Sequence, residues 1–297
     1  MSNPRYVHVD VFAHAPLSGN GLTVFLDCDT WSIALMQRLT QEMKQFESIF
    51  LSAITADGAH ARIFTVEEEL PFAGHPVLGA AVVLHRLQAA QTEHAHWRMS
   101  LPSGVLSVTT RKIGAHYLAE MNQGRAVFGN VVEGEALASI LARLGLDAGD
   151  LAPGFPAQVI STGLPYLIVP VTAAALARTA INGDTLDALL AAQNARFVLV
   201  LDVAARELRT WDNLGRCEDV ATGSAAGPVA AYLLQHAGAD RADALALAQG
   251  RYAGRPSRLH ARCTAQDEWL VSGEVWPLSS GVLDLDPSEL ASVAHDR

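Results

Sequence analysis

The segment Phe72-Ala73-Gly74-His75-Pro76 contains a residue that can take part in catalysis, His75. The imidazole of His75 can exchange a proton near neutral pH. Proline is tolerated at the first helical position, where the amide is unpaired, and it disfavours the helical conformation in the residue before it. We therefore expect Pro76 to begin an apolar helix that ends near Leu87, with His75 extended before it and free to face a ligand. The same pattern fits a histidine that caps the helix or lies at the edge of the core, so both roles stay open.

The second segment runs from Glu218 to Pro228 and also introduces an apolar helix. Pro228 requires this helix to begin only a few residues earlier, so the amides near Gly223 to Ala226 are unpaired first-turn donors. Such amides, together with the positive end of the helix dipole, bind a carboxylate without lysine or arginine. Ser224 lacks the G-x-S-x-G spacing of a hydrolase nucleophile and is expected to donate a hydrogen bond instead. Asp219 is either a catalytic carboxyl or an acid of the turn.

A further carboxyl group of interest, that of Glu47, opens the predicted strand from Glu47 to Leu51. It shares a face with Ile49, and desolvation there would raise its pKa and let it take and return a proton. An exposed carboxylate at the mouth of the strand fits the sequence equally well. The run Glu67-Glu68-Glu69 is expected to be solvated, because like charges repel, and we assign it no catalytic role.

The elements around these segments recur in the same order in the two halves of the chain. In the first half, Thr30 is expected to cap an amphipathic helix with an apolar residue at every fourth position from Trp31 to Met43. Short strands and the helix that follows Gly74 come next. In the second half, strands and another helix lead to Gly223, which lies 149 residues after Gly74 in a chain of 297 residues. Self-similarity at half the chain length predicts two similar lobes.

These patterns predict an α+β fold of two pseudo-symmetric lobes. Each lobe has many short strands and one helix that is apolar all round, which favours a curled, mostly antiparallel sheet around a central helix. We expect the N-terminal lobe to span residues 1–130, with the C-terminal segment 278–297 as a possible addition, and the C-terminal lobe to span residues 131–277. The stretch 133–144 is expected to be a helix near this boundary.

Composition excludes several function classes. Half of the residues are hydrophobic, 18% are charged and the formal net charge is −10, so neither a nucleic acid nor an anionic membrane is an expected partner. The apolar stretch from Val77 to Leu84 is too short to span a membrane, and we expect a cytoplasmic protein. Three cysteines without a C-x-x-C pair and eleven histidines without H-E-x-x-H predict no metal site.

Several motifs together resemble the PhzF-like phenazine-biosynthesis family of the diaminopimelate-epimerase superfamily. The resemblance runs over nearly the whole chain, from Val9-Asp10-Val11-Phe12 and Gly19-Asn20, through Phe46-Glu47-Ser48 and Glu69 to Pro76, to Glu218-Asp219, Ala221 to Pro228, Gln249-Gly250, Gly254 to Ser257 and Val271-Ser272-Gly273. It implies two curled-sheet lobes, a homodimer, and neither a cofactor nor a metal. It also implies a small carboxylate-bearing metabolite as the partner molecule.

The family resemblance also assigns roles within the site. Glu47 matches a glutamate that moves a proton between ring carbons, and His75, Asp219 and Ser224 match polar residues that position the substrate and assist the transfer. The binding positions are Gly74 and Gly223, whose amides would hold the carboxylate, together with Thr222.

Similarity to this family implies a cofactor-independent isomerase that resembles trans-2,3-dihydro-3-hydroxyanthranilate isomerase. The thiol-dependent racemases of the superfamily carry paired cysteines where this chain has Ala73 and Thr222, so a two-thiol stereoinversion is disfavoured. Two alternatives remain: an epimerase or racemase of a small amino or hydroxy acid that uses Glu47, and a metabolite-binding member of the family without turnover.

Overall fold

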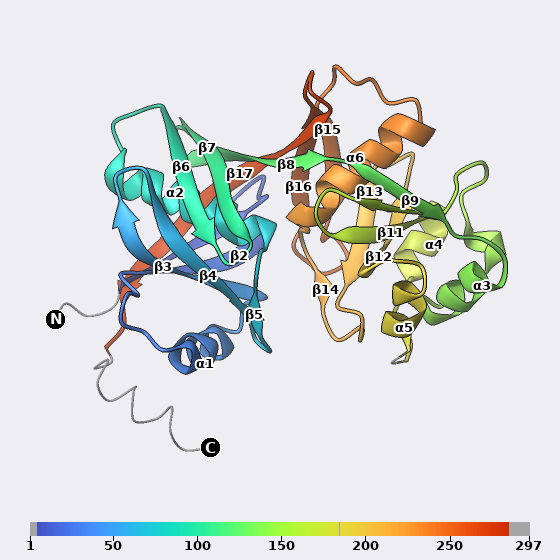
Figure 1. Ribbon diagram of the computed structural model, residues 1–297, viewed down its shortest axis with the longest axis horizontal. Coiled ribbons are helices and arrows are strands. Elements are labelled where there is room, and N and C mark those ends of the chain that lie inside the picture. The colour runs from blue at the N-terminus through green and yellow to red at the C-terminus, as the bar shows by residue number, and fades with distance from the viewer. Residues whose placement is uncertain (1–4, 184, 285–297) are drawn as a thin grey trace. The chain divides into compact units, whose positions relative to one another are not determined.

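The computed structural model describes residues 5–183 and 185–284 and divides into two compact units (Figure 1). Unit 1 comprises the described residues of Met1–Met121 and Ser272–Arg297, and unit 2 is Asn122–Val271. Of the C-terminal segment 278–297, residues 285–297 lie outside the described part of the chain. The secondary structure is mostly β, with few helices.

Unit 1 is built on eight paired strands and one short additional strand. They are β1 (Arg5–Val11), β2 (Asn20–Leu26), β3 (Glu47–Thr55), β4 (Gly58–Thr65), β5 (Glu69–Leu70), β6 (His94–Leu101), β7 (Gly104–Ile113), β8 (His116–Arg125) and β17 (Glu268–Val282). The strands β8 and β17 contribute residues to both units.

The strands of unit 1 form a closed, barrel-like sheet. Hydrogen-bonded pairing runs in the order β1, β2, β3, β4, β6, β7, β8 and β17, and β17 pairs back to β1. The pairs β2–β3 and β4–β6 are parallel, and the two-residue strand β5 pairs antiparallel with β4. Pairing at both edges leaves no long open edge in this sheet.

The helix α2 (Gly74–Gln88) contacts six strands of unit 1, β1, β2, β3, β4, β6 and β7 (Figure 1). Every residue from Gly74 to His85 is buried, as expected for a helix with apolar residues on all sides. Gly79 permits the close approach to β2, because a Cβ atom there would lie 2.5 Å from a methyl group of Leu22.

The helix α1 (Ile33–Met43) packs through Leu35, Met36 and Leu39 against an aromatic cluster. This cluster includes Phe25, Phe50 and Phe64. The expectation that Thr30 caps this helix is wrong. Ser32 is the N-cap, and its side chain accepts a hydrogen bond from the amide of Leu35. Serine two residues further along meets the same capping requirement, and the apolar spacing does not distinguish the two starts.

Unit 2 repeats the pairing order of unit 1. Its strands are β9 (Val127–Val131), β10 (Gln158–Ser161), β11 (Pro165–Pro170), β12 (Phe197–Asp202), β13 (Glu207–Trp211), β14 (Glu218–Asp219), β15 (Leu245–Gln249) and β16 (Ser257–Cys263). The pairs β11–β12 and β13–β15 are parallel, like β2–β3 and β4–β6, and the two-residue strand β14 pairs with β13 as β5 pairs with β4.

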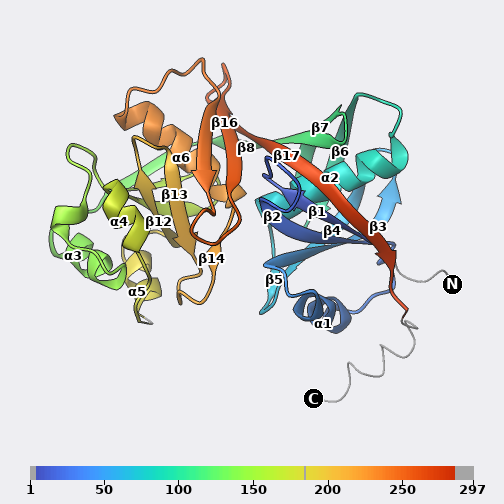
Figure 2. The same cartoon turned by 180° about the vertical axis from the view of Figure 1, so that it is seen from behind.

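The helix α6 (Gly223–His236) precedes β15, as α2 precedes β6, and contacts β10, β11 and β16 (Figure 2). The other helices of unit 2 are α3 (Gly134–Arg143), α4 (Ala173–Arg178), α5 (Leu186–Ala191) and the 3-10 turn η1 (Ala148–Asp150). The helix expected over 133–144 is therefore confirmed. No helix among the described residues has the length and apolar character that crossing a membrane requires.

Candidate active site

The first group of predicted site residues lies where β3 and α2 begin. Glu47 is the first residue of β3, and Gly74 and His75 are the first two residues of α2. The expected start at Pro76 is wrong, because Pro76 is the third helical residue and His75 lies inside the first turn. Each amide of a first turn lacks a helical acceptor, so proline fits there without breaking a hydrogen bond.

Glu47 and His75 form a buried pair. The Nδ1 atom of His75 lies 3.1 Å from Oε2 of Glu47, and the two residues are 4% and 5% exposed respectively. The Nδ2 atom of Asn20, at the start of β2, lies 3.3 Å from the same Nδ1 atom. Of the two environments left open for Glu47, exposure at the mouth of the strand is excluded, because the residue is buried.

Burial decides the charge state of His75. It lowers the pKa of the imidazole to about 3, so the ring is neutral at neutral pH. The Nε2 atom is buried and has no hydrogen-bond partner among the described residues. A buried polar atom without a partner is costly unless something else pairs with it, and a substrate atom would meet that need.

The second group lies where β14 leads into α6. One carboxylate oxygen of Asp219 accepts a hydrogen bond from the amide of Ala221 at 3.1 Å, and the other accepts one from the hydroxyl of Thr222 at 2.6 Å. The side chain of Gln249 bonds the same turn three times, to the amide and the hydroxyl of Thr222 and to the carbonyl of Asp219. These contacts fix the carboxylate of Asp219 within the turn before α6.

The hydroxyl of Ser224, in the first turn of α6, lies 2.7 Å from the hydroxyl of Tyr166. The carbonyl of Gly223 accepts a hydrogen bond from the side chain of Gln123 at 2.8 Å, and Thr162 donates to that same amide side chain at 3.0 Å. These contacts fix the first turn of α6 from two different strands.

The predicted site residues thus form two groups, Glu47 with Gly74 and His75 in unit 1, and Asp219 with the turn from Thr222 to Ser224 in unit 2. The sequence analysis did not identify four polar partners of these residues, which are Asn20, Gln123, Tyr166 and Gln249. Asn20 and Gln249 belong to family motifs that could have singled them out. Tyr166 and Gln123 have no local sequence signal.

A bidentate arginine–glutamate pair holds the short strand before each group. In unit 1, Arg62 of β4 bonds both carboxylate oxygens of Glu69 in β5, at 2.7 and 2.6 Å. In unit 2, Arg209 of β13 bonds Glu218 of β14 in the same way, at 2.8 and 2.7 Å. The expectation of a solvated acidic run is therefore wrong for Glu69, whose partner lies on the neighbouring strand and could not be found from the run itself.

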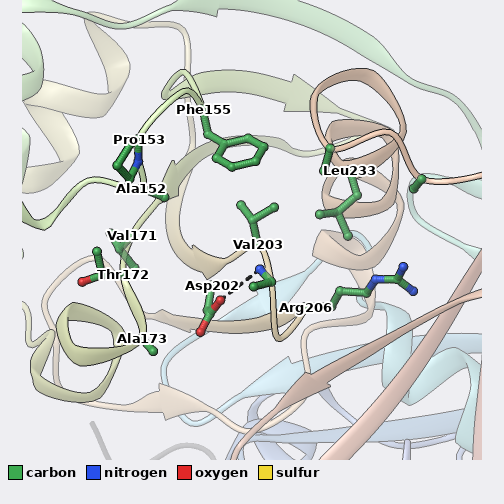
Figure 3. Close-up of a pocket in the computed structure, with 13 residues that line it drawn as sticks. Ala152, Pro153, Phe155, Val171, Thr172, Ala173, Asp202, Val203, Arg206 and Leu233 are labelled. Carbon is green, nitrogen blue, oxygen red and sulfur yellow. Dashed lines mark hydrogen bonds between the residues drawn. The ribbon is translucent and has the colours of Figure 1, made fainter.

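A cavity of about 500 Å³ in unit 2 is separate from both groups (Figure 3). Its wall includes Phe155, Val203 and Leu233, and none of the predicted site residues lines it. Leu233 lies about 14 Å along α6 from Ser224 at 1.5 Å per residue. Within the described ranges, no three histidine, cysteine or acidic side chains are grouped to hold a metal ion.

Comparison with known proteins identifies the family. The model of the phenazine biosynthesis-like proteins matches residues 9–279. The chain belongs to this family. Trans-2,3-dihydro-3-hydroxyanthranilate isomerase of Pseudomonas aeruginosa is 35% identical over 279 residues, which cover 91% of this chain and 94% of that protein. The protein of the same name from Pseudomonas chlororaphis is 33% identical over 282 residues, with the same coverage.

A solved structure described as a predicted epimerase of Pseudomonas aeruginosa is also similar to this chain. It is 47% identical, has a TM-score of 0.90, and the match covers 96% of this chain and 100% of that one. A protein of Escherichia coli that is 30% identical over 251 residues is described as an uncharacterized isomerase. The chain is an isomerase of this family.

Proposed function

We propose that this isomerase moves a proton between carbon atoms of a small ring that bears a carboxylate, and that trans-2,3-dihydro-3-hydroxyanthranilate represents its substrate class. The observation that carries the proposal is the buried pair of Glu47 and neutral His75. A carboxyl group in such a desolvated place can both remove a proton from carbon and return it.

In the proposed reaction, the carboxylate of Glu47 removes a proton from one ring carbon, and the electron pair of the broken C–H bond shifts into the ring. The protonated carboxyl then returns the proton to a second carbon of the same ring. Proton and electrons balance within the substrate and one side chain, so the reaction needs no cofactor. The neutral ring of His75 holds the Glu47 carboxyl through Nδ1, and we assign its Nε2 atom to a polar substrate group.

The amides of Gly74, at the start of α2, and of Gly223, at the start of α6, are proposed as carboxylate-binding positions, one in each unit. Both helices begin without a side-chain cap, because neither Ala73 nor Thr222 bonds a first-turn amide through its side chain. Unpaired amides at a helix start, together with the helix dipole, favour an anion. Asp219 and Ser224 are proposed to orient the polar groups of the ring, with Thr222 as part of the binding turn.

A single carboxyl base favours isomerisation over two-base racemisation. The repeated pairing order puts β12 in unit 2 in the place that β3 takes in unit 1. Whereas β3 begins with Glu47, β12 begins with Phe197. Stereoinversion by two bases requires one base on each face of the stereocentre. Of the two corresponding strand starts, only that of β3 carries a carboxyl group.

An epimerase or racemase is the second candidate, supported by the description of the 47% identical structure as a predicted epimerase. Solvent deuterium entering a stereocentre with inversion would establish it. A third possibility is a metabolite-binding member of the family, which would bind a carboxylate saturably and convert none of a panel of ring acids.

We also propose that the two units are pseudo-symmetric lobes, each with its helix, α2 or α6, enclosed by a curled sheet. The repeated pairing order and the burial of both helices support this arrangement. Assembly as a cytoplasmic homodimer completes the proposal, and sedimentation of the purified protein would test it, since a monomer at micromolar concentration would contradict it.

The deciding experiment measures conversion of trans-2,3-dihydro-3-hydroxyanthranilate by absorbance and product mass. Glu47→Gln keeps the shape of the side chain but cannot accept the proton, so we expect kcat to fall at least a thousandfold. The matched control is Glu68→Gln, because Glu68 is exposed, and it should retain the activity of the unaltered protein. Unchanged turnover by Glu47→Gln would refute the role of this carboxyl.

A further inference from the structure

The side chain of Gln249 makes three hydrogen bonds to the turn before α6. Its Oε1 atom accepts from the amide of Thr222 at 2.9 Å, and its Nε2 atom donates to the hydroxyl of Thr222 at 2.9 Å and to the carbonyl of Asp219 at 2.7 Å. Gln249 ends β15 and is 1% exposed. Water therefore cannot easily replace these bonds.

Gly250, the residue after Gln249, brings the end of β15 close to the turn before α6. Gly250 has a φ of +80°, and a Cβ atom there would lie 2.5 Å from the carbonyl oxygen of Val220 and 2.3 Å from that of Arg255. Only glycine permits this close approach. The end of β15 is therefore held directly against the turn that carries Asp219 and Thr222.

Thr222 is the N-cap residue of α6 but does not cap it. Threonine at this position ordinarily accepts a hydrogen bond from a first-turn amide. Thr172, the N-cap of α4 in the same unit, does so with the amide of Ala175 at 3.3 Å. The hydroxyl of Thr222 instead accepts from Gln249 and donates to Asp219.

We propose that Gln249 is a positioning residue that keeps the hydroxyl of Thr222 away from the first turn of α6, so that the amides of Gly223 and Ser224 remain available for the substrate carboxylate. Without the donor from Gln249, the hydroxyl can turn and cap the helix itself. Self-capping and the carboxylate would then compete for the amide of Ser224, the second residue of the helix. This inference rests on the proposed binding of a carboxylate at α6.

A double-mutant cycle tests the inference. The variants are Gln249→Met, Thr222→Ala and their combination, with Gln266→Met as the matched control, because Gln266 is an exposed residue of the same unit. Calorimetry gives the Kd for anthranilate, a ring carboxylate, and steady-state kinetics give KM and kcat for trans-2,3-dihydro-3-hydroxyanthranilate.

We expect Gln249→Met to raise the Kd and KM at least tenfold and to lower kcat less than threefold. In the Thr222→Ala background, which has no hydroxyl to cap the helix, the same change should raise the Kd less than threefold. An equal loss in both backgrounds, or no loss in either, would overturn the inference. If Gln249→Met does not fold, Gln249→Glu serves instead, because its carboxylate cannot donate to Thr222.

A crystal structure of the Gln249→Met variant separates this inference from the proposed function. We expect the Thr222 hydroxyl to lie within hydrogen-bond distance of the amide of Ser224. A hydroxyl that still bonds Asp219 would overturn the inference even if the enzyme turns over. If the unaltered protein neither binds anthranilate nor converts the ring substrate, the proposed function fails, and the position of the hydroxyl still decides the role of Gln249.

Discussion

At the scale of single residues, burial gives Glu47 and His75 their chemistry. A carboxylate and an imidazole 3.1 Å apart at an exposed site favour the protonated, charged imidazole, whereas here both side chains are buried and the imidazole is held neutral. The same burial has a consequence for stability, because the unfolded chain restores the ordinary pKa of His75.

His75 should make the protein less stable in acid. Its pKa is about 3 in the folded state against 6.5 as its ordinary value, so between these values the unfolded chain binds a proton that the folded chain does not. Protonation of His75 in the unfolded chain therefore does not affect the free energy of unfolding above pH 6.5. As the pH falls from 6.5 toward 3, it lowers the free energy of unfolding progressively. We expect thermal denaturation of His75→Asn to depend less on pH between 7 and 4 than that of the unaltered protein.

The control for this measurement is His94→Asn, because the side chain of His94 is 68% exposed. This variant should keep the pH dependence of the unaltered protein. A His75→Asn variant whose melting temperature falls as steeply with acid would contradict the pKa of His75.

Tyr166 is expected to orient Ser224. Its hydroxyl lies 2.7 Å from that of Ser224, and the residue is 3% exposed. Tyr166→Phe removes this contact but keeps the ring, so we expect kcat to fall about tenfold while the melting temperature changes little. Unchanged kinetics on the ring substrate would show that the orientation of Ser224 does not matter to turnover.

At the scale of elements, each site segment depends on a strand of only two residues. Neither β5 nor β14 is long enough to hold its register by pairing alone, and each carries the glutamate of a bidentate pair. The guanidinium groups also lie over aromatic rings, Arg62 over Phe64 at 5.7 Å and Arg209 over Trp211 at 4.7 Å. The duplicated chain therefore uses the same contact twice to fix the approach to a helix start.

Removal of the pair in unit 2 should cost stability. The side chains of Arg209 and Glu218 are 9% and 13% exposed, so Arg209→Met leaves a buried carboxylate without its partner. We expect a loss of about 3 kcal/mol in the free energy of unfolding, measured by urea denaturation. Arg5→Met, in a pair with Asp27 whose side chains are both 52% exposed, should cost less than about 1 kcal/mol. Equal losses would contradict the structural role of the Arg209 pair.

At the scale of the whole molecule, the last strand of the chain completes the first unit. The pairing of β17 with β1 extends from Val275 opposite Val11 to Val282 opposite Arg5. The closed sheet of unit 1 thus includes strands from both ends of the sequence, whereas unit 2 is one continuous segment, Asn122–Val271.

A chain that ends at Val271 should therefore lose the fold of unit 1, because β1 and β8 would each keep an unpaired edge where β17 now pairs. We expect this truncation to aggregate or to be cut by protease within residues 5–121. A chain that ends at Asp284 keeps every described strand and should unfold at the temperature of the full chain. If the chain ending at Val271 resists protease as well as the full chain does, the closing role of β17 is wrong.

The sequence by itself determined the helices that begin at the two glycine-rich segments, the strand that begins at Glu47, and the duplication at an offset of 149 residues. These features are local, because apolar spacing, proline and glycine act within a few residues. Local spacing also has a limited resolution. It placed the helix starts at Thr30 and Pro76, whereas the N-cap is Ser32 and the first helical residue of α2 is Gly74.

Only the tertiary structure decided which side chains pair. Asn20 is 55 residues from His75, Tyr166 is 58 from Ser224, and Gln249 is 27 from Thr222, so no local pattern connects them. It also decided the burial of Glu47 and the pairing of Glu69 with Arg62. Burial and hydrogen bonding depend on which strands become neighbours. The spacing of apolar residues shows which face of a helix or strand is apolar, but it does not show which other element packs against that face.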